Sequence, residues 1–347
     1  MNIGNTLIDW YHRHKRDLPW RNTRDAYKIW LSEIILQQTR VEQGLPYYER
    51  FIKTFPNISA LANANEDEIL KLWQGLGYYS RARNLHSAAK QVLQEYNGKF
   101  PSSFNEIITL KGVGEYTAAA IASFAFNVKH PVLDGNVYRC IARLFGIHEP
   151  IDNAKSKKVF YEILWKEIEH ADPHLFNQAI MEFGAMQCRP KNPDCGICPF
   201  ADQCYALKHN KVDELPIKEK KLKKRNRYFN YFVVRTEDDL LALQKRTQQD
   251  IWQHLYEFPM LESESILQEP DLFQVDFYKS SFSKKAVLHN KSRDFKHILS
   301  HQHIFAKFWE VRDPQFLAQN RGKYLFIKDE ELRDFALPRL IERYLEK

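Results

Sequence analysis

The chain has 347 residues, 44% of them hydrophobic, and carries a formal net charge of +7. This composition can bury a core and excludes a largely disordered chain. No apolar run reaches the length of about 18 residues that a membrane span needs, and the N-terminal segment lacks a signal-peptide pattern, so we expect a cytoplasmic protein. The basic balance suits a polyanionic partner, although many basic proteins bind no nucleic acid.

Helical periodicity dominates the chain up to about Leu207. Apolar residues recur at helical spacing in Ala26–Gln38, Ile69–Trp73, Leu85–Leu93, Thr117–Phe126, Val137–Leu144 and Val159–Ile168. Glycine and proline separate these segments, and no alternating strand pattern interrupts them. The sequence therefore predicts a mostly α-helical domain at residues 1–210.

A basic stretch at residues 211–227 marks a change of character. Within it, Pro216–Arg227 has the single acid Glu219 against the basic residues Lys218, Lys220, Lys221, Lys223, Lys224, Arg225 and Arg227. Such a run is usually a solvated linker, and it can also lie along a phosphate backbone.

Strand signals follow the linker. Tyr228–Arg235 and Leu240–Gln244 predict a hairpin around a turn at Glu237–Asp239. Further strands are expected at Ile304–Val311 and Tyr324–Ile327, with a closing helix at Pro338–Leu345. We therefore expect a second, α+β domain at residues 228–347.

Four of the five cysteines form a cluster with the spacing Cys188-x6-Cys195-x2-Cys198-x5-Cys204, whereas Cys140 stands apart. Without a secretion signal, such a cluster suggests a metal site before disulfides. Four thiolates can hold zinc or an iron–sulfur cluster, but structural zinc usually takes two Cys-x2-Cys pairs and only one is present. The single compact loop therefore favours a cubane cluster over zinc, and over four unrelated buried cysteines.

Two glycines separate two predicted helices, Ser103–Leu110 and Tyr116–Phe126, within the sequence Lys111-Gly112-Val113-Gly114-Glu115. Glycine lets the backbone turn sharply and come close to a ligand. The free N–H groups at the start of the second helix would then favour an anion such as a phosphate. An ordinary helical hairpin is the alternative interpretation.

Two carboxylates stand out by their surroundings in the sequence. Glu33 falls on a helical stripe with Ile29 and Trp30, although most helical glutamates lie on the solvated surface. Partial burial would raise its pKa and make it a proton donor near neutral pH. Asp134 precedes a predicted helix, where it can act as an N-cap and be kept ionised by nearby N–H groups. One protonated and one ionised carboxyl is the arrangement used in glycoside cleavage.

These motifs together resemble the MutY family of DNA glycosylases, within the endonuclease III-like superfamily. The cysteine spacing is similar to its [4Fe–4S] loop, and Leu110–Gly114 resembles its helix-hairpin-helix, which usually has proline where Lys111 stands. Ser32–Thr39 and Leu133–Val137 resemble the segments that carry its catalytic Glu and Asp.

The resemblance implies a helix-hairpin-helix glycosylase fold with one [4Fe–4S] cluster, followed by a Nudix-like α+β domain. It also implies a function: monofunctional hydrolysis of the N-glycosidic bond of adenine. The implied partner is double-stranded DNA in which adenine is mispaired with 8-oxoguanine or guanine, and we expect a monomer.

The resemblance also implies roles for individual residues. Glu33 would donate a proton to adenine, Asp134 would stabilise the sugar cation, and Tyr116 stands where bifunctional relatives place a Schiff-base lysine. The residues implied to meet DNA phosphates are Lys111, Gly112, Val113, Gly114, Arg189 and Lys191. Those implied to line the adenine pocket or enter the base stack are Leu18, Trp20, Arg21, Gln38, Tyr78 and Gln178. For Trp20 and Tyr78, packing in the core is the alternative.

In the C-terminal domain, Leu299-Ser300-His301 resembles the Phe-Ser-His loop with which this family contacts 8-oxoguanine, and Leu299 departs from the usual Phe. Ser300 and His301 are therefore implied to bind the damaged base. A metal site is one interpretation of His297, His301 and His303, but exposed polar histidines are the simpler interpretation. The Nudix catalytic pattern of Glu and Arg is absent, so we expect recognition without hydrolase activity.

Three other functions fit parts of the sequence. A bifunctional pyrimidine-lesion glycosylase with lyase activity is disfavoured by Tyr116 and by the additional domain. A non-catalytic iron–sulfur DNA-binding protein would not need Glu33 on an apolar stripe. A nucleotide pyrophosphatase would need the missing Nudix pattern.

Overall fold

The computed structural model describes residues 3–219 and 224–346, which group into two compact units. The first unit comprises residues 3–63 and 84–219, and the second comprises 64–83 and 224–346. The second unit thus includes a segment of the helical half, which the domain boundaries expected from the sequence assign to the first domain. Residues 220–223, which hold Lys220, Lys221 and Lys223 of the expected linker, lie outside the described residues.

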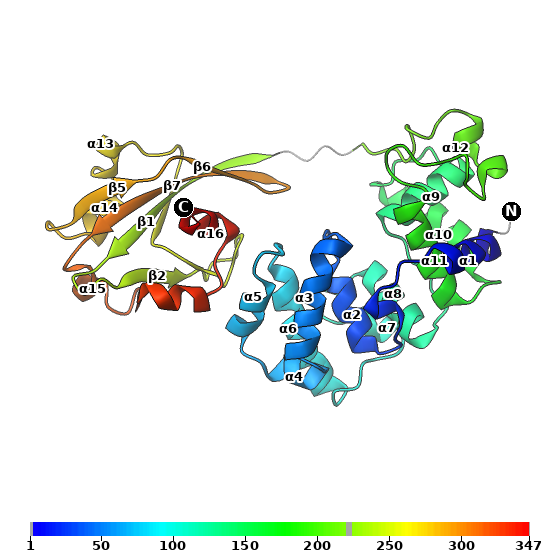
Figure 1. Ribbon diagram of the computed structural model, residues 1–347, viewed down its shortest axis with the longest axis horizontal. Coiled ribbons are helices and arrows are strands. Elements are labelled where there is room, and N and C mark those ends of the chain that lie inside the picture. Colours follow the sequence, from blue (N-terminus) through cyan, green and yellow to red (C-terminus); the bar gives the residue numbers. More distant parts are fainter. Residues whose placement is uncertain (1–2, 220–223, 347) are drawn as a thin grey trace. The chain divides into compact units, whose positions relative to one another are not determined.

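The first unit is built from helices (Figure 1). Its longer helices are α1 (Ile3–His14), α2 (Ala26–Ile35), α3 (Val41–Thr54), α8 (Glu115–Phe126), α9 (Gly135–Phe145), α10 (Ala154–Ile168) and α11 (Pro173–Met186). Shorter turns of helix are η1 (Pro19–Arg21), α4 (Ile58–Asn63), α7 (Phe104–Ile107), η2 (Ala201–Gln203) and α12 (Tyr205–Lys208). Helix α5 (Glu66–Trp73) belongs to the second unit, and α6 (Ser80–Glu95) begins there and continues in the first.

Local sequence explains where the helices around the site begin and how they pack. Asp25 caps α2 and Asp172 caps α11, and each side chain accepts a hydrogen bond from a backbone N–H of the first turn. Helix α2 packs against α8, which buries several alanines, among them Ala119 and Ala122. Helices α1 and α9 both pack against α11.

Within the described residues, the second unit holds an eight-stranded sheet. Its strands are β1 (Arg225–Arg235), β2 (Leu241–Lys245), β3 (Tyr256–Glu257), β4 (Met260–Ser263), β5 (Val287–Lys291), β6 (Phe295–Ile298), β7 (Gln302–Arg312) and β8 (Leu325–Ile327). The main path runs β3-β2-β1-β7-β5, while β4 pairs with β1, β6 with β7 and β8 with β2. The helices that accompany the sheet are α13 (Glu269–Leu272), α14 (Asp276–Ser281), α15 (Phe316–Gln319), η3 (Asp329–Asp334) and α16 (Arg339–Leu345).

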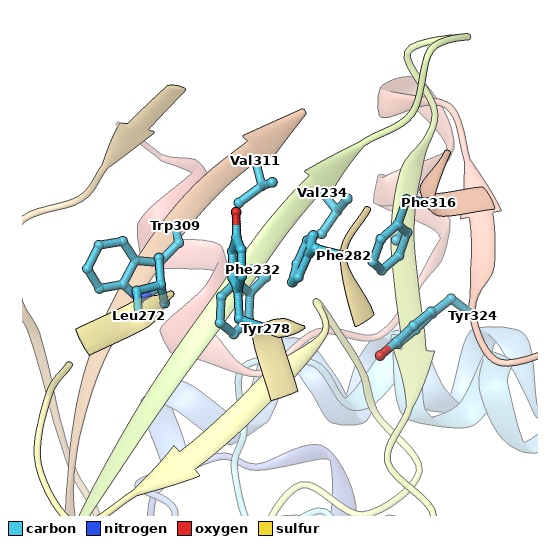
Figure 2. Packing of buried hydrophobic residues seen from close by; sticks show 10 residues of the cluster. Phe232, Val234, Leu272, Tyr278, Phe282, Trp309, Val311, Phe316 and Tyr324 are labelled. Atoms are coloured by element: carbon cyan, nitrogen blue, oxygen red, sulfur yellow. The ribbon is translucent and has the colours of Figure 1, made fainter. Parts of the chain in front are cut away.

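One face of this sheet carries an aromatic core (Figure 2). Strands β1 and β7 run parallel, with Phe232 beside Trp309 and Val234 beside Val311. These four side chains share a face because alternate residues of a strand point to the same side. The residues that complete the core are Ala242, Leu272, Tyr278, Phe282, Phe316 and Tyr324.

The structure confirms the expected order of a helical region followed by an α+β region. It also contains the predicted hairpin, as β1 and β2, and the predicted strands at β7 and β8. Strands β3 to β6 were not anticipated. In the described part of the chain, none of the helices combines the length and the apolar character that crossing a bilayer requires.

Candidate active site and cysteine loop

A pocket of about 530 Å³ opens in the first unit. Among its lining residues are the candidates Leu18, Trp20, Arg21, Glu33, Tyr116, Asp134 and Gln178. These residues come from α2, α8, α11 and the segments before α2 and α9, so the fold assembles side chains that are far apart in sequence. Gln38 does not belong to this lining. It lies exposed beyond the end of α2, with a φ of 54°.

Glu33 lies in the last turn of α2 and is 8% exposed. The hydroxyl of Tyr116, in the first turn of α8, donates a hydrogen bond of 2.8 Å to its Oε2 atom. Burial raises the pKa of Glu33 to about 7, although the hydrogen bond from Tyr116 acts in the opposite direction. Burial and the charge of Glu33 raise the pKa of Tyr116 well above its ordinary value, so the phenol keeps its proton and remains a donor.

Asp134 is both the N-cap of α9 and part of the pocket wall. Its Oδ1 atom accepts the backbone N–H groups of Asn136 at 2.9 Å and Val137 at 2.8 Å. The side-chain amide of Asn136 donates to Oδ2 at 2.8 Å, and Arg139 donates to the oxygen of that amide. Burial raises the pKa of Asp134, and these hydrogen bonds oppose the rise. The sequence suggested the N–H groups as the main influence, whereas the structure adds burial as the larger one.

Glu182 is a buried carboxylate in the pocket that sequence reasoning missed. Its carboxylate pairs with Arg16 at 2.7 Å and with Arg21 at 2.6 Å. Burial acts to raise its pKa, but the hydrogen bonds from Arg21 and Arg16 lower it to about 2. Arg21 is therefore an ion-paired wall residue. The signal in the sequence was the spacing of four between Gln178 and Glu182, which places both on one face of α11.

The remaining candidates of the adenine pocket are also in place. Leu18 and Trp20 are buried in the wall, and the ring of Trp20 meets Tyr48 edge-on. Trp20 thus belongs to the core and to the pocket at once. Gln178 is 5% exposed, and its amide contacts Tyr11 and His174.

A second pocket, of about 400 Å³, lies in the second unit and brings together Tyr78, Ser300 and His301. The hydroxyl of Tyr78 donates to Oγ of Ser300 at 2.9 Å. Tyr78 is 44% exposed, so the alternative of core packing does not describe it. Its φ of 46°, together with positive φ at Gly75 and Gly77, shapes the loop that presents its ring.

The hairpin between α7 and α8 depends on one glycine in particular. Gly112 has a φ of +75°, and a Cβ atom there would come within 2.5 Å of the Asn84 side chain. Gly114 is the N-cap of α8, and no described side chain caps that end. The first N–H groups of the helix are thus free of a side-chain cap, as an anion site requires. Lys111 is exposed beside them.

The four clustered cysteines line one small apolar pocket of the first unit, together with Phe183 and Arg143. The Arg143 guanidinium donates to the carbonyls of Leu215, Arg189 and Pro190, and to Sγ of Cys188 at 3.5 Å. In the described part of the chain, no three cysteine, histidine or carboxylate ligands converge on a single point. The four cysteine side chains instead line one shared pocket, and cysteine thiols are the ligands that an iron–sulfur cluster takes. Arg189 and Lys191 are exposed in the same loop.

Comparisons with known families divide the chain into three matched segments. Residues 31–170 match the HhH-GPD superfamily of base excision DNA repair proteins. Residues 188–204, from the first to the last clustered cysteine, match the iron-sulfur binding domain of endonuclease III. Residues 230–347 match the NUDIX domain.

Two curated relatives illustrate the similarity over the chain. The adenine DNA glycosylase of Buchnera aphidicola subsp. Baizongia pistaciae is 36% identical over 348 residues, which span 99% of this chain and 95% of that protein. The adenine DNA glycosylase of Homo sapiens is 38% identical over 219 residues, which span 60% of this chain and 40% of that protein.

Solved structures resemble the helical part. A thermostable thymine-DNA glycosylase superposes with a TM-score of 0.56 and 29% identity, over 60% of this chain and 95% of that chain. A non-covalent endonuclease III–DNA complex gives a TM-score of 0.50 at 20% identity, over 60% of this chain and 96% of that chain, which is a likeness of fold.

Proposed function

We propose that this chain, which belongs to the adenine DNA glycosylase family, hydrolyses the N-glycosidic bond of adenine opposite 8-oxoguanine or guanine and leaves the abasic strand uncut. The observation that carries this proposal is a buried Glu33 carboxyl, hydrogen-bonded to Tyr116, in one pocket with Asp134. The pocket volume falls in the range of about 300–1,000 Å³ that is typical of small-molecule sites.

Glu33 is suited to act as the general acid. Adenine is a poor leaving group until a ring nitrogen is protonated, and a carboxyl with a pKa of about 7 carries a proton near neutral pH. Oε2 accepts the hydrogen bond from Tyr116, which leaves Oε1 as the oxygen that can present the acidic proton to adenine. After proton transfer, the same hydrogen bond stabilises the carboxylate. General acid catalysis of this kind contributes about 10²–10⁴ to the rate.

Asp134 is suited to stabilise the positive charge that develops on the sugar. Its two backbone hydrogen bonds and the amide of Asn136 fix the direction of the carboxylate. A preorganised charge of this kind needs no rearrangement as the bond breaks. The division of roles between the two carboxyls follows from their partners: a single phenol for Glu33, and three N–H donors for Asp134.

The absence of strand cleavage follows from Tyr116. A lyase reaction needs an amine to form a Schiff base with the sugar, and a phenol cannot form an imine. The hydroxyl of Tyr116 is moreover engaged with Glu33. Lys111 is exposed on the hairpin and does not line the pocket, so any lyase activity through it should be much slower than base release.

One assay tests the reaction and its outcome. The protein is incubated with duplexes that contain adenine opposite 8-oxoguanine, adenine opposite guanine, or thymine glycol, and products are resolved with and without alkali. We expect adenine release from the first two duplexes and strand breaks only after alkali. Equal rates of base release and strand cutting without alkali would instead support the bifunctional alternative.

For the cofactor, we propose one [4Fe–4S] cluster held by the four clustered cysteines, Cys188, Cys195, Cys198 and Cys204. When bound, it would crosslink the loop that carries Arg189 and Lys191. The protein itself contributes Arg143, which ties three carbonyls around this loop together. Anaerobically purified protein should be brown and contain iron, whereas stoichiometric zinc without iron would refute the assignment.

The contacts with DNA are proposed for two regions of the molecule. Residues 111–114 of the hairpin, with Arg189 and Lys191, would bind phosphates and so position the duplex without reading its sequence. Tyr78 would enter the base stack, and Ser300 and His301 would contact 8-oxoguanine. We propose that Gln38 also enters the stack, since its exposed position beyond α2 leaves it accessible. One protein monomer would bind one duplex.

A further inference from the structure

The buried carboxylate of Glu182, in α11, holds residues 16–21, which contribute to the wall of the pocket that contains Glu33. Its Oε1 atom accepts hydrogen bonds from the backbone N–H and from Nε of Arg16, each at 2.9 Å, and from Arg21 at 2.8 Å. Its Oε2 atom accepts from Arg16 at 2.7 Å and from Arg21 at 2.6 Å. The side chain of Glu182 is fully buried, and that of Arg21 is 13% exposed. One buried negative charge is thus shared by two positive charges in the pocket wall.

The charge of Arg21 acts on the proposed general acid. Arg21 and Glu33 line the same pocket from η1 and α2, which pack against each other. Burial is the main reason that the pKa of Glu33 is raised, and the positive charge of Arg21 acts in the opposite direction. A nearby positive charge stabilises the ionised carboxylate, so an Arg21 without its partner would favour loss of the proton from Glu33.

Other charged or titratable groups also face Glu33 from the elements around α2. Tyr116 of α8 lowers the pKa of Glu33 through its hydrogen bond, and the charge of Asp134, before α9, raises it. From the start of α3, Arg40 and Glu42 line the pocket with opposite signs. Both are exposed to solvent, which screens their charges.

Glu182 stays ionised over the pH range in which Glu33 titrates. Burial acts to raise the pKa of Glu182, but the hydrogen bonds from Arg21 and Arg16 lower it to about 2. We infer that Glu182 is a positioning residue for the general acid: it holds Arg21 in the wall and offsets its charge, so that Glu33 keeps its proton. The inference rests on the proposed role of Glu33 as the acid.

The test is the pH dependence of adenine release in single turnover, with protein in excess over an adenine:8-oxoguanine duplex. The readout is the pH at which the rate constant falls to half of its plateau, because a loss of active protein does not alter it. Glu182→Gln keeps the shape of the side chain and removes its charge. The midpoint should fall from about 7 by about 1 unit, since an opposite charge close to a carboxyl lowers its pKa by about 1–3 units. An unchanged midpoint would overturn the inference.

Two double variants of equal net charge identify which arginine is responsible. Arg21→Gln combined with Glu182→Gln removes the opposing charges together, so the midpoint should return close to that of the unaltered protein. Arg16→Gln combined with Glu182→Gln has the same net charge but leaves Arg21 without its partner, so the midpoint should stay low. Equal midpoints in the two double variants would mean that only the total charge of the wall matters, and the role assigned to Arg21 would be wrong.

Arg21→Gln alone keeps the inference testable if Glu182→Gln does not fold. It leaves Glu182 paired with Arg16, so no buried charge is left alone. Its midpoint should rise, because a positive charge near Glu33 is removed and the negative charge remains, and a midpoint that does not rise contradicts the inference.

The unaltered protein separates this inference from the proposed function. If its rate constant does not change between about pH 5 and 9, Glu33 is not the acid, and the inference fails together with that proposed role. If its midpoint lies near 7 and the variants share it, the proposed role of Glu33 survives and the role of Glu182 is refuted.

Discussion

Burial raises the pKa of the Glu33 carboxyl and the hydrogen bond from Tyr116 lowers it, and burial has the larger effect. The carboxyl therefore carries a proton near neutral pH, and a substitution that removes this proton should slow the reaction. Glu33→Gln keeps the shape and an oxygen that can accept from Tyr116, but it has no acidic proton. Adenine release in single turnover should fall by about 10²–10⁴. Binding to an adenine:8-oxoguanine duplex should stay close to that of the unaltered protein. A variant that retained its full rate would show that another group is the acid.

The raised pKa of Glu33 also predicts that the stability of the protein depends on pH. The folded pKa of Glu33 is about 7 and its ordinary value is 4.5, so the native state holds this proton more tightly than the unfolded chain. The proton on Glu33 therefore contributes fully to the free energy of unfolding below the ordinary pKa of 4.5, and this contribution is lost as the pH rises through 7. The loss is about 3 kcal/mol once the group is ionised.

Thermal unfolding of the unaltered protein and of Glu33→Gln measures this loss. The other carboxyls titrate in both proteins, so their contributions largely cancel in the difference between the two melting temperatures. Glu33→Gln does not titrate at this site, so its melting temperature relative to the unaltered protein should be higher at pH 8 than at pH 5. Adenine release by the unaltered enzyme should decline as the pH rises above 7, since only the protonated carboxyl of Glu33 can donate a proton. An identical difference in melting temperature at both pH values would contradict the assigned pKa.

At the scale of elements, the hairpin before α8 depends on the left-handed conformation of Gly112. Gly112→Ala would combine a positive φ with a contact of 2.5 Å to Asn84, at a cost of about 1–3 kcal/mol. The displaced hairpin should bind all duplexes more weakly, matched or mismatched, because phosphate contacts carry no sequence information. Fluorescence anisotropy with both kinds of duplex measures the effect.

Gly114→Ala is the matched control for this change. Gly114 has a φ of −94°, and an added Cβ atom there would meet no atom within 4 Å. It should weaken binding far less than Gly112→Ala. Equal losses for both variants would mean that the effect comes from any side chain near the phosphate, and not from the backbone of Gly112.

The sequence predicted elements well where one periodicity persisted over several turns, and poorly where pairing is made at long range. The window Ala26–Gln38 predicts a helix, and α2 ends at Ile35 because the chain turns before Gln38. Strands β3 to β6 are short, and β5 is mostly exposed, so no apolar alternation marked them. Glu182 was missed because a glutamate on an apolar helix face reveals its arginine partners only after folding.

At the scale of the whole molecule, the segment 64–83 belongs to the C-terminal unit through polar contacts that no local pattern encodes. Asp67 in α5 accepts hydrogen bonds from Lys245 and from Tyr256, the latter at 3.0 Å, and Glu66 pairs with His254. Removal of the C-terminal region would leave these carboxylates without their partners. Point substitutions in the full chain therefore test recognition of 8-oxoguanine more cleanly than truncation does.

The hydrogen bond between Tyr78 and Ser300 joins residues 222 positions apart at the second pocket. Tyr78→Phe keeps the ring and removes the hydroxyl, and Ser300→Ala removes its partner. Each change should lower the preference for adenine opposite 8-oxoguanine over adenine opposite guanine by about 2–10-fold, the net value of one hydrogen bond. Because both variants remove the same hydrogen bond, the double variant should be no worse than Ser300→Ala alone.

Tyr256→Phe is the control, since it breaks a hydrogen bond between the segment 64–83 and the sheet without touching the second pocket. It should leave the preference unchanged while lowering the melting temperature slightly. Ser300→Ala should lower the preference more than Tyr78→Phe only if Ser300 also forms a hydrogen bond directly with the damaged base. The difference between the two variants in this preference therefore measures that direct contact. If neither substitution changes the preference, the second pocket does not recognise 8-oxoguanine, and the discrimination must arise elsewhere in the protein.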